Sequence, residues 1–419
     1  MAHNMARLCI ATALILLAPL AGQKGFTTHV MSLIGWQESS LREALGNASI
    51  TSFGEVQGTL VDMVLTGAGG DFISLSSDGD NFYLCHYDFN GTKKWLISHP
   101  LGRTTRKVER LVVSEDGTAI VVQGGDQAIE SYANWIFDGT GSLLFSDVDA
   151  SGIYYPSPNG DHFVRDSDDL DGQLEIYQRD GSPIEFNLPD RFASGKVKER
   201  FVDDDHLLIY QERVVDSSRI AELILVDFPS LEIKWSHQFD HRMGGGNFNL
   251  DYSAISPKYI CTIMPGSGLT VFSRRSGERL WGYADIGWWR DLAFDEEGEI
   301  LYFLTEGKFL NIIDIKAKLV TDSYRLFDYG NAYGWSHLTF TTHGLVFTNS
   351  HLVAHYTDAN GVKKRTVGMG SVLVRTNNQN QVQEVMVIPG YALYQTFRDR
   401  KEFYLIKQSG KKIERLNLR

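Results

Sequence analysis

The sequence predicts an all-β chain made of repeated antiparallel sheets, and three observations support this fold class. A strand-turn-strand unit recurs about every 46 residues from Leu60 to the C-terminus, most clearly at 81–95, 223–235 and 269–281. Each repeat has short β-branched and aromatic runs separated by Gly or charged turns. The 40 glycines suit a chain with many turns. Self-similarity at this period, with one four-stranded sheet per repeat, is typical of a β-propeller.

The sixth repeat shows the four strands of one sheet most clearly. Its β-rich runs lie at 290–294, 300–304, 309–315 and 319–324, and we name such strands a to d, with a at the central axis. The a–b turn recurs at 114–117, 157–160 and 295–298, beginning with Ser or Asp and ending with Gly. A Ser or Asp side chain nucleates such a turn, and Gly takes the positive φ that the turn needs.

The number of sheets follows from the c–d hairpins. Eight segments match this hairpin, near residues 90, 139, 181, 229, 276, 316, 360 and 409. Eight hairpins predict eight four-stranded blades, the last of them from about Val382. An extra strand-like run at 372–378 keeps seven blades plus an appendage as an alternative. In repeat four, the insertion 212–222 is expected to form an extended b–c hairpin or loop.

A tryptophan follows the c–d turn at nearly the same offset in three repeats, as Trp95, Trp235 and Trp281. We expect these side chains to pack between neighbouring blades, because sheets that stand face to face around an axis need apolar faces. The pattern of strand, Asp, Gly-containing turn and Trp resembles the PQQ-like repeat family, and the a–b turns look like those of WD-repeat propellers. The resemblance covers roughly residues 60–419.

The resemblance implies a fold more than an activity. Members of the PQQ-like family include quinone-dependent dehydrogenases and a non-enzymatic periplasmic scaffold of outer-membrane assembly. The dehydrogenases need a vicinal Cys pair and a Ca²⁺ site, and this chain has no Cys-Cys pair. The resemblance therefore favours a non-enzymatic member.

The N-terminus is typical of an export signal. An apolar run from Leu8 to Ala21 follows Arg7, and it is too short to span a bilayer comfortably. We expect residues 1–22 to be a signal peptide or N-terminal anchor, 23–58 an N-terminal extension with helical character at 33–45, and 59–419 the propeller. The expected location is periplasmic, cell-surface or extracellular, with no membrane span in the mature chain.

The amino-acid composition limits the classes of partner that the chain is expected to bind. Asp and Glu number 52 against 40 Lys and Arg, so the net charge is -12. An acidic surface repels phosphate backbones, and we expect no nucleic-acid partner. Cys85 and Cys261 fall in repeats one and five, far apart around a ring, which predicts two buried free thiols rather than a disulfide.

The sequence contains no cluster of residues that is typical of catalysis or metal binding. The histidines are scattered through the repeats at one or two each, so we expect no catalytic residue and no cofactor. A weak Ca²⁺ candidate is the loop with Asp166, Asp168, Asp169 and Asp171. It fails the EF-hand pattern, since Gln178 stands where a bidentate Glu belongs, and a solvated acidic loop is the favoured interpretation.

One cluster of residues is a candidate binding site. The segments before strands a of two adjacent repeats bring together aromatic and basic residues, namely Trp288, Trp289, Arg290, Trp335 and His337. Trp and Arg dominate binding hot spots. The hypothesis is a scaffold that binds a protein or saccharide-like partner at the channel mouth. The alternatives are tryptophans that only pack between blades, and an enzyme, quinone-dependent or a hydrolase or lyase, with an axial active site.

Overall fold

The structure is a computed structural model, and it describes the greater part of the chain from residue 49 onward. The described residues are 34–35, 49–66, 71–88, 90–102, 107–126, 131–150, 152–167, 174–184, 196–215, 218–239, 253–264, 268–283, 289–295, 297–305, 309–325, 336–341, 344–357, 360–389, 392–393, 404–409 and 411–417. These residues form strands and turns, and no helix among them has the length and hydropathy to cross a bilayer.

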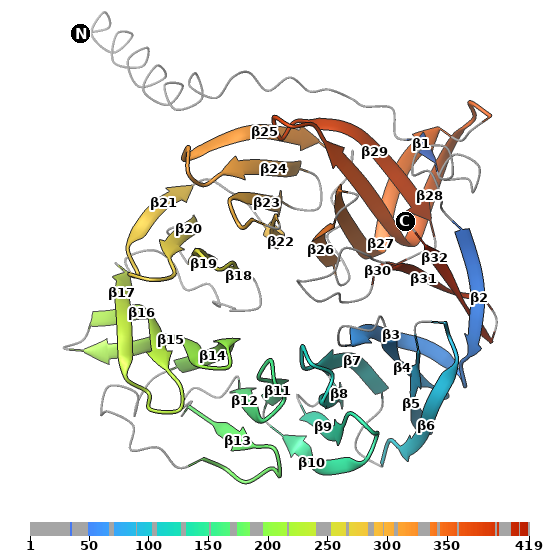
Figure 1. Cartoon of the computed structure of the whole chain (residues 1–419), viewed down its shortest axis with the longest axis horizontal. Coiled ribbons are helices and arrows are strands. Elements are labelled where there is room, and N and C mark those ends of the chain that lie inside the picture. Colours follow the sequence, from blue (N-terminus) through green and yellow to red (C-terminus); the bar gives the residue numbers. More distant parts are fainter. Residues whose placement is uncertain are drawn as a thin grey trace, which may run out of the picture.

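The strands of the first half of the ring form four antiparallel sheets, and the strands of each follow one another from the innermost outward (Figure 1). Sheet 1 contains β3 (Thr59–Thr66), β4 (Asp71–Ser77), β5 (Asn81–Tyr87) and β6 (Lys93–Pro100). Sheet 2 contains β7 (Lys107–Val113), β8 (Ala119–Asp126), β9 (Ser131–Asp138) and β10 (Leu143–Ala150). Sheet 3 contains β11 (Gly152–Pro156), β12 (His162–Ser167) and β13 (Ile176–Gln178). Sheet 4 contains β14 (Lys196–Asp203), β15 (His206–Val215), β16 (Ser218–Asp227) and β17 (Ile233–Phe239).

Four more sheets complete the described part of the ring. Sheet 5 contains β18 (Ala254–Ile255), β19 (Tyr259–Met264), β20 (Gly268–Ser273) and β21 (Arg279–Tyr283). Sheet 6 contains β22 (Trp289–Phe294), β23 (Ile300–Thr305), β24 (Phe309–Asp314) and β25 (Leu319–Arg325). Sheet 7 contains β26 (Ser336–Thr341), β27 (Gly344–Thr357), β28 (Lys363–Thr376), β29 (Val382–Pro389) and the short parallel β1 (Ile34–Gly35). Sheet 8 contains β30 (Ala392–Leu393), β31 (Tyr404–Ser409), β32 (Lys412–Asn417) and β2 (Ser49–Glu55).

The core lies between the sheets, as a propeller requires. Six clusters of buried apolar side chains each join two neighbouring sheets, from sheets 1 and 2 through to sheets 6 and 7. Phe72, Phe163 and Phe303 are among the largest side chains with no exposed surface. Because each sheet is apolar on both faces, it is stable only with a neighbour on each side. The predicted all-β propeller fold is confirmed.

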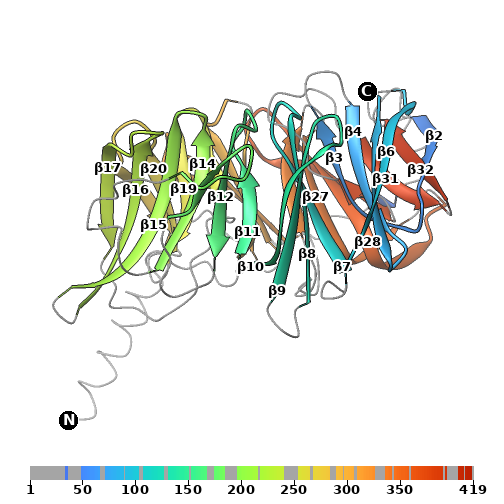
Figure 2. The same ribbon diagram turned by 90° about the horizontal axis from the view of Figure 1, so that it is seen from below.

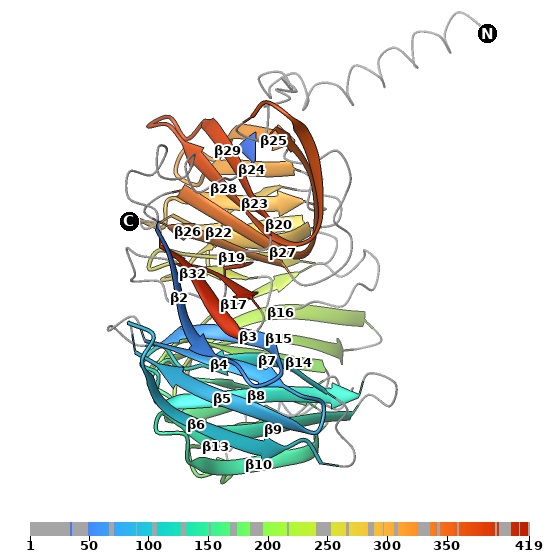
Figure 3. The same cartoon turned by 90° about the vertical axis from the view of Figure 1, so that its right-hand side faces the viewer.

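The ring closes by pairing the two ends of the chain. Strand β2 pairs antiparallel with β32 from Ser49↔Asn417 to Glu55↔Lys412, so sheet 8 contains residues from both ends (Figure 3). Val56 N donates to Lys411 O at 2.8 Å, and Tyr87 Oη of sheet 1 donates to Glu55 O at 3.0 Å. The ring therefore includes a strand from the segment 23–58 that the sequence analysis placed before the propeller.

The predicted a–b turns and the repeat-four insertion are confirmed. Ser114 Oγ accepts Ala119 N at 2.9 Å, and Gly117, Gly160 and Gly298 have φ of 76°, 67° and 69°. Strands β15 and β16 form an extended b–c hairpin, paired to Val215↔Ser218 (Figure 2). The buried thiols of Cys85 and Cys261 are free, as predicted.

Two of the eight predicted c–d hairpins were assigned wrongly. The turns near residues 360 and 409 join β27 to β28 and β31 to β32, which are the b and c strands of their sheets. The extra run at 372–378 is the end of β28, and the segment from Val382 is strand d of sheet 7 rather than the start of the eighth repeat. The c–d turn of sheet 7 is 377–381, where Asn380 has a φ of 57°.

The predicted role of the repeated tryptophans is confirmed. A Cβ added to Gly277, in the c–d turn of sheet 5, would lie 2.5 Å from the Trp235 ring of sheet 4. A Cβ added to Gly141 of sheet 2 would likewise lie 3.3 Å from the Trp95 ring of sheet 1. Trp235 Nε1 also donates to Arg274 O at 2.8 Å. Trp281 packs in the cluster that joins sheets 5 and 6. The rings of Trp95 and Trp235 thus fill the space under the c–d turn of the next sheet.

Replacing Gly277 with Ala is expected to destabilise the protein by more than the backbone cost alone. Gly277 has a φ of 68°, and its Cβ would overlap the Trp235 ring. Gly361 is the matched control, since its φ is 78° and nothing lies within 4 Å of its Cβ. Urea unfolding should show a loss of about 1–2 kcal/mol for Gly361→Ala. It should show at least about 1 kcal/mol more for Gly277→Ala, because overpacking adds to the same backbone strain. Equal losses would mean that the tryptophan does not occupy the space under the turn.

Candidate functional site

The direction of the innermost strands defines two faces of the ring. The turns after β7 and β11 are joined by a bond from Thr118 Oγ1 to Asn159 O at 2.9 Å. Asn159 N in turn donates to Asp204 Oδ1, after β14, at 2.9 Å. The turns after β18 and β22 are joined by the Lys258–Glu299 ion pair at 2.6 Å. Since the ends of neighbouring innermost strands meet, these strands run in the same direction. We call the side where they begin the mouth face, and the side of these turns the turn face.

A carboxylate joins the innermost strands of sheets 6 and 7. Asp291 Oδ2 accepts the backbone N–H of Leu338 at 2.5 Å, and its Oδ1 accepts the N–H of Leu292 at 2.8 Å. The pairing of β22 with β23 shifts register between Trp289 and Asp291. A bulge of this kind redirects side chains. Here Asp291 reaches the next sheet instead of solvent.

The same arrangement recurs between sheets 1 and 2. Asp62 Oδ2 accepts Leu111 N at 2.8 Å and its Oδ1 accepts Met63 N at 2.8 Å, next to a register shift between Leu60 and Asp62. We call Asp62 and Asp291 the inter-sheet carboxylates. The same bond therefore fixes one innermost strand against the next at two places in the described part of the ring.

Burial raises the pKa of both inter-sheet carboxylates above that of a solvated Asp. Desolvation raises the pKa of Asp62 to about 6 and that of Asp291 to about 7, and the two backbone N–H donors of each group oppose the rise. Arg110 also lowers the pKa of Asp62.

The structure describes the backbone of three of the five predicted site residues. Trp289 and Arg290 begin β22, directly before Asp291, and His337 lies in β26, directly before Leu338. The Asp291–Leu338 hydrogen bond therefore holds Trp289, Arg290 and His337 on adjacent innermost strands near the mouth face. Trp288 and Trp335 lie outside the described residues. That these five side chains form a binding site stays a prediction.

The candidate Ca²⁺ residues are described only in part. Lys198 Nζ contacts Asp166 Oδ1 at 2.6 Å, and the neighbouring Glu199 is buried at 4% exposure. Burial raises the pKa of Glu199 well above its usual value, and the nearby Asp166 carboxylate raises it further. Asp168, Asp169 and Asp171 lie outside the described residues. Within the described ranges, no three His, Cys, Asp or Glu side chains are grouped to hold a metal ion.

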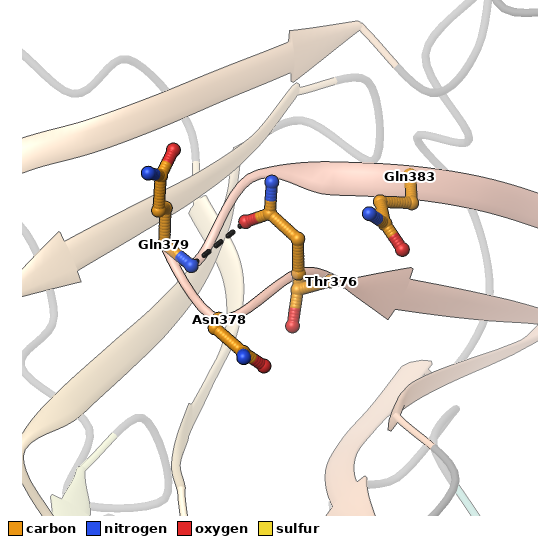
Figure 4. Close-up of a pocket in the computed structure, with 5 residues that line it drawn as sticks. Thr376, Asn378, Gln379 and Gln383 are labelled. Carbon is orange, nitrogen blue, oxygen red and sulfur yellow. Dashed lines mark hydrogen bonds between the residues drawn. The ribbon is translucent and has the colours of Figure 1, made fainter.

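A shallow polar depression lies elsewhere, at the c–d turn of sheet 7 (Figure 4). It has a volume of about 460 Å³ and is lined by Thr376, Asn377, Asn378, Gln379 and Gln383. The Asn377 side chain is used to hold the turn, since its Oδ1 accepts Gln379 N at 2.9 Å. The depression is on the turn face and includes none of the predicted site residues.

The inter-sheet carboxylates are not predicted by the repeat pattern. A signal exists, because Asp62 and Asp291 each follow the first two or three residues of strand a and precede an apolar residue. In sequence alone, such an aspartate cannot be told from a solvated one. Only the contact with the next repeat distinguishes them.

Comparisons with known proteins agree on the fold. No protein-family model and no curated protein sequence matches the chain. Among solved structures, the chain is similar to the crystal structure of BamB from Moraxella catarrhalis, with a TM-score of 0.55 and 11% identity over 88% of this chain and 100% of that one. It is also similar to the C-terminal WD40 domain of Sif2, with a TM-score of 0.51 and 10% identity over 88% of this chain and 98% of that domain. At these identities the likeness shows the β-propeller fold.

Proposed function

We propose that the chain is an exported binding scaffold that holds a protein partner on the mouth face, at Trp288, Trp289, Arg290, Trp335 and His337. The observation that carries the proposal is the Asp291–Leu338 hydrogen bond of 2.5 Å, because it fixes the two strands that bear Trp289, Arg290 and His337 side by side. A rigid pair of strands presents such residues at a low cost in conformational entropy.

The chemistry of the five residues suits a protein surface. Aromatic rings supply large contact areas with few rotatable bonds, and Arg and His add directed hydrogen bonds. The likeness to BamB and to a WD40 domain supports the proposal through the fold alone. The apolar run from Leu8 to Ala21 supports export of the chain.

The double variant Trp288→Ala, Trp335→Ala is expected to lose the partner and keep the fold. Partners would be captured on immobilised protein from the envelope fraction of the source cells and quantified by mass spectrometry. Loss of two aromatic anchors should weaken capture by at least about tenfold, since hot-spot residues contribute about 2 kcal/mol or more each. The melting temperature should stay within about 2 °C of the parent value, because surface substitutions change stability little.

Trp95→Ala is the matched control. Trp95 packs under Gly141 and within the cluster of sheets 1 and 2, so this variant should melt at a lower temperature and keep the partner in its folded fraction. If the double variant instead melts as low as Trp95→Ala while its folded fraction still captures the same proteins, Trp288 and Trp335 are core residues. The proposed site would then be wrong.

A further inference from the structure

The depression at the c–d turn of sheet 7 is lined by five polar residues, and none of them carries a charge (Figure 4). It lies in the segment 376–383, where six of the eight side chains are carboxamides of Asn or Gln. The chain as a whole is 22% charged and has a net charge of -12. This turn is therefore a neutral, hydrogen-bonding surface on an acidic protein.

Two of the carboxamides hold the shape of the turn. Asn377 Oδ1 accepts the N–H groups of Gln379 and Gln381, each at 2.9 Å, and Asn377 Nδ2 donates to Gln381 Oε1 at 3.2 Å. Backbone bonds from Asn377 N to Gln381 O and from Asn380 N to Asn377 O, both at 2.9 Å, complete the turn. The conformation of the turn is thus set by its own hydrogen bonds.

Both ends of the turn are also bonded to sheet 6. Burial raises the pKa of Tyr302 in β23 to about 12, and a side-chain hydrogen bond with Thr376 opposes the rise. Tyr324 Oη of β25 donates to Val382 O at 3.1 Å. Because the turn is held against the neighbouring sheet on both sides, a ligand that binds there orders little additional backbone.

The remaining lining carboxamides are available to a ligand. Asn378, Gln379 and Gln383 are exposed, and within the described part of the chain their side chains make no hydrogen bond or ion pair. The charged residues beside the depression, Arg375 and Glu384, contact each other at 3.3 Å and do not line it. Each carboxamide offers N–H donors and a carbonyl acceptor. The depression therefore presents donors and acceptors together, without charge.

Neutral hydroxyl groups match this surface best. A hydroxyl both donates and accepts, so two neighbouring hydroxyls of a sugar ring can bond to the N–H and the C=O of one carboxamide. A charged ligand would find no opposite charge among the lining residues. An apolar ligand would leave the carboxamides without partners. The volume of about 460 Å³ lies in the range of small-molecule sites.

We infer that this depression is a binding site for a neutral carbohydrate, held by the carboxamides of Asn378, Gln379 and Gln383. The site lies on the turn face, so it is separate from the mouth face and does not rest on the proposed function. A chain with both sites would hold a protein partner on one face and a glycan on the other.

Nuclear magnetic resonance of the full chain labelled with nitrogen-15 tests this site, because it observes the side-chain NH2 groups of Asn and Gln directly. The probes are the neutral trisaccharides maltotriose, cellotriose and N-acetylated chitotriose. Each is added to about 20 mM, since a few neutral hydrogen bonds give millimolar affinity. At least one probe should shift the NH2 signals of Asn378, Gln379 and Gln383. The acidic trisaccharide trigalacturonate should leave these signals unchanged at the same concentration.

The double variant Asn378→Ala, Gln383→Ala should weaken binding of that trisaccharide by at least about tenfold, the size expected when several hydrogen bonds are lost. Its melting temperature should stay within about 2 °C of the parent value, because both side chains are exposed. The matched control is Gln57→Ala, Asn90→Ala, which removes one exposed Gln and one exposed Asn outside the depression. Its Kd should change less than about twofold.

Three results would overturn the inference. They are no shift of the three NH2 signals with any neutral trisaccharide, an equal shift with trigalacturonate, and equal losses of affinity in the two double variants. If Asn378→Ala, Gln383→Ala melts at a lower temperature, the shifts in the parent chain decide. The variant Trp288→Ala, Trp335→Ala should bind the trisaccharide like the parent, so the two proposals fail separately.

Discussion

Deletion of residues 1–55 is expected to cost the protein several kcal/mol of stability and its solubility, whereas deletion of residues 1–47, which removes the two-residue β1 but keeps β2, should cost much less. The longer deletion removes β2, which pairs with β32 from Ser49↔Asn417 to Glu55↔Lys412. The expected loss of unfolding free energy follows from the seven residues of β2, at about 1 kcal/mol for each backbone hydrogen bond that is lost. The loss also exposes the edge of β32, and an unpaired edge strand promotes aggregation.

The shorter deletion is the control, because it keeps β2 and removes the same residues before it. Thermal unfolding and size-exclusion chromatography of the two truncated chains would compare them. A ring that is closed by β2 predicts a much lower melting temperature and larger species for the longer deletion only. If both chains melt together as monomers, the pairing of β2 with β32 does not hold the ring closed.

Asp291→Ala is expected to lower the free energy of unfolding by about 2–4 kcal/mol, since two backbone N–H groups lose their acceptor. The carboxylate joins β22 to β26 through Leu338, so its loss also frees the two strands that carry the candidate site. Asp180→Ala is the matched control. Asp180 accepts Ser182 N within one exposed turn, and its removal should cost less than about 1 kcal/mol.

The effect of Asp291→Ala should be larger at pH 5 than at pH 8. Desolvation raises the pKa of Asp291 from 3.8 to about 7 in the folded chain, so the folded state binds the proton more tightly than the unfolded state. The contribution of the protonated group to stability is fully present below pH 3.8 and is lost as pH rises through 7. Urea unfolding of the parent and the Asp291→Ala variant at pH 5 and pH 8 measures this contribution. A destabilisation that grows with pH would contradict this environment for Asp291.

The fold could be predicted from the sequence because each sheet is made mostly of consecutive strands. The a–b turns at Ser114, Ser157 and Asp295 can be recognised from local sequence, because each has a side chain that nucleates the turn and a Gly that follows it. The boundary of the ring could not be found in this way. Strand β2 pairs with a segment more than 350 residues later in the chain, and a repeat search sees only neighbouring strands.

The two misassigned hairpins show the limit of counting glycine turns. Asn360-Gly361 and Ser409-Gly410 have the composition of a c–d turn, but that composition suits any tight hairpin. The true c–d turn of sheet 7 has Asn380 in the left-handed conformation, and the turns of sheets 4 and 6 have Leu231 and Lys318 there, with φ of 57° and 56°. Of these three turns without a left-handed Gly, the sequence located those near 229 and 316 and missed the one at 377–381.

The candidate site was predictable only as a set of residue types on two adjacent repeats. The sequence brought Trp289, Arg290 and His337 together because both repeats have the same register. It did not reveal the hydrogen bond between Asp291 and Leu338 that fixes their strands. That bond joins two sheets, and its partners are set by how the ring packs rather than by local sequence.

The most direct test of the proposed binding scaffold is site-specific photo-crosslinking of the exported chain in its native envelope. A photoreactive phenylalanine analogue would replace His337 on the mouth face, and in a second chain Ser276, in the c–d turn of sheet 5 on the turn face. A mouth-face scaffold predicts a discrete adduct with a protein partner from position 337 and none from position 276. An adduct only from position 276, or none from position 337 in a folded chain, would contradict it.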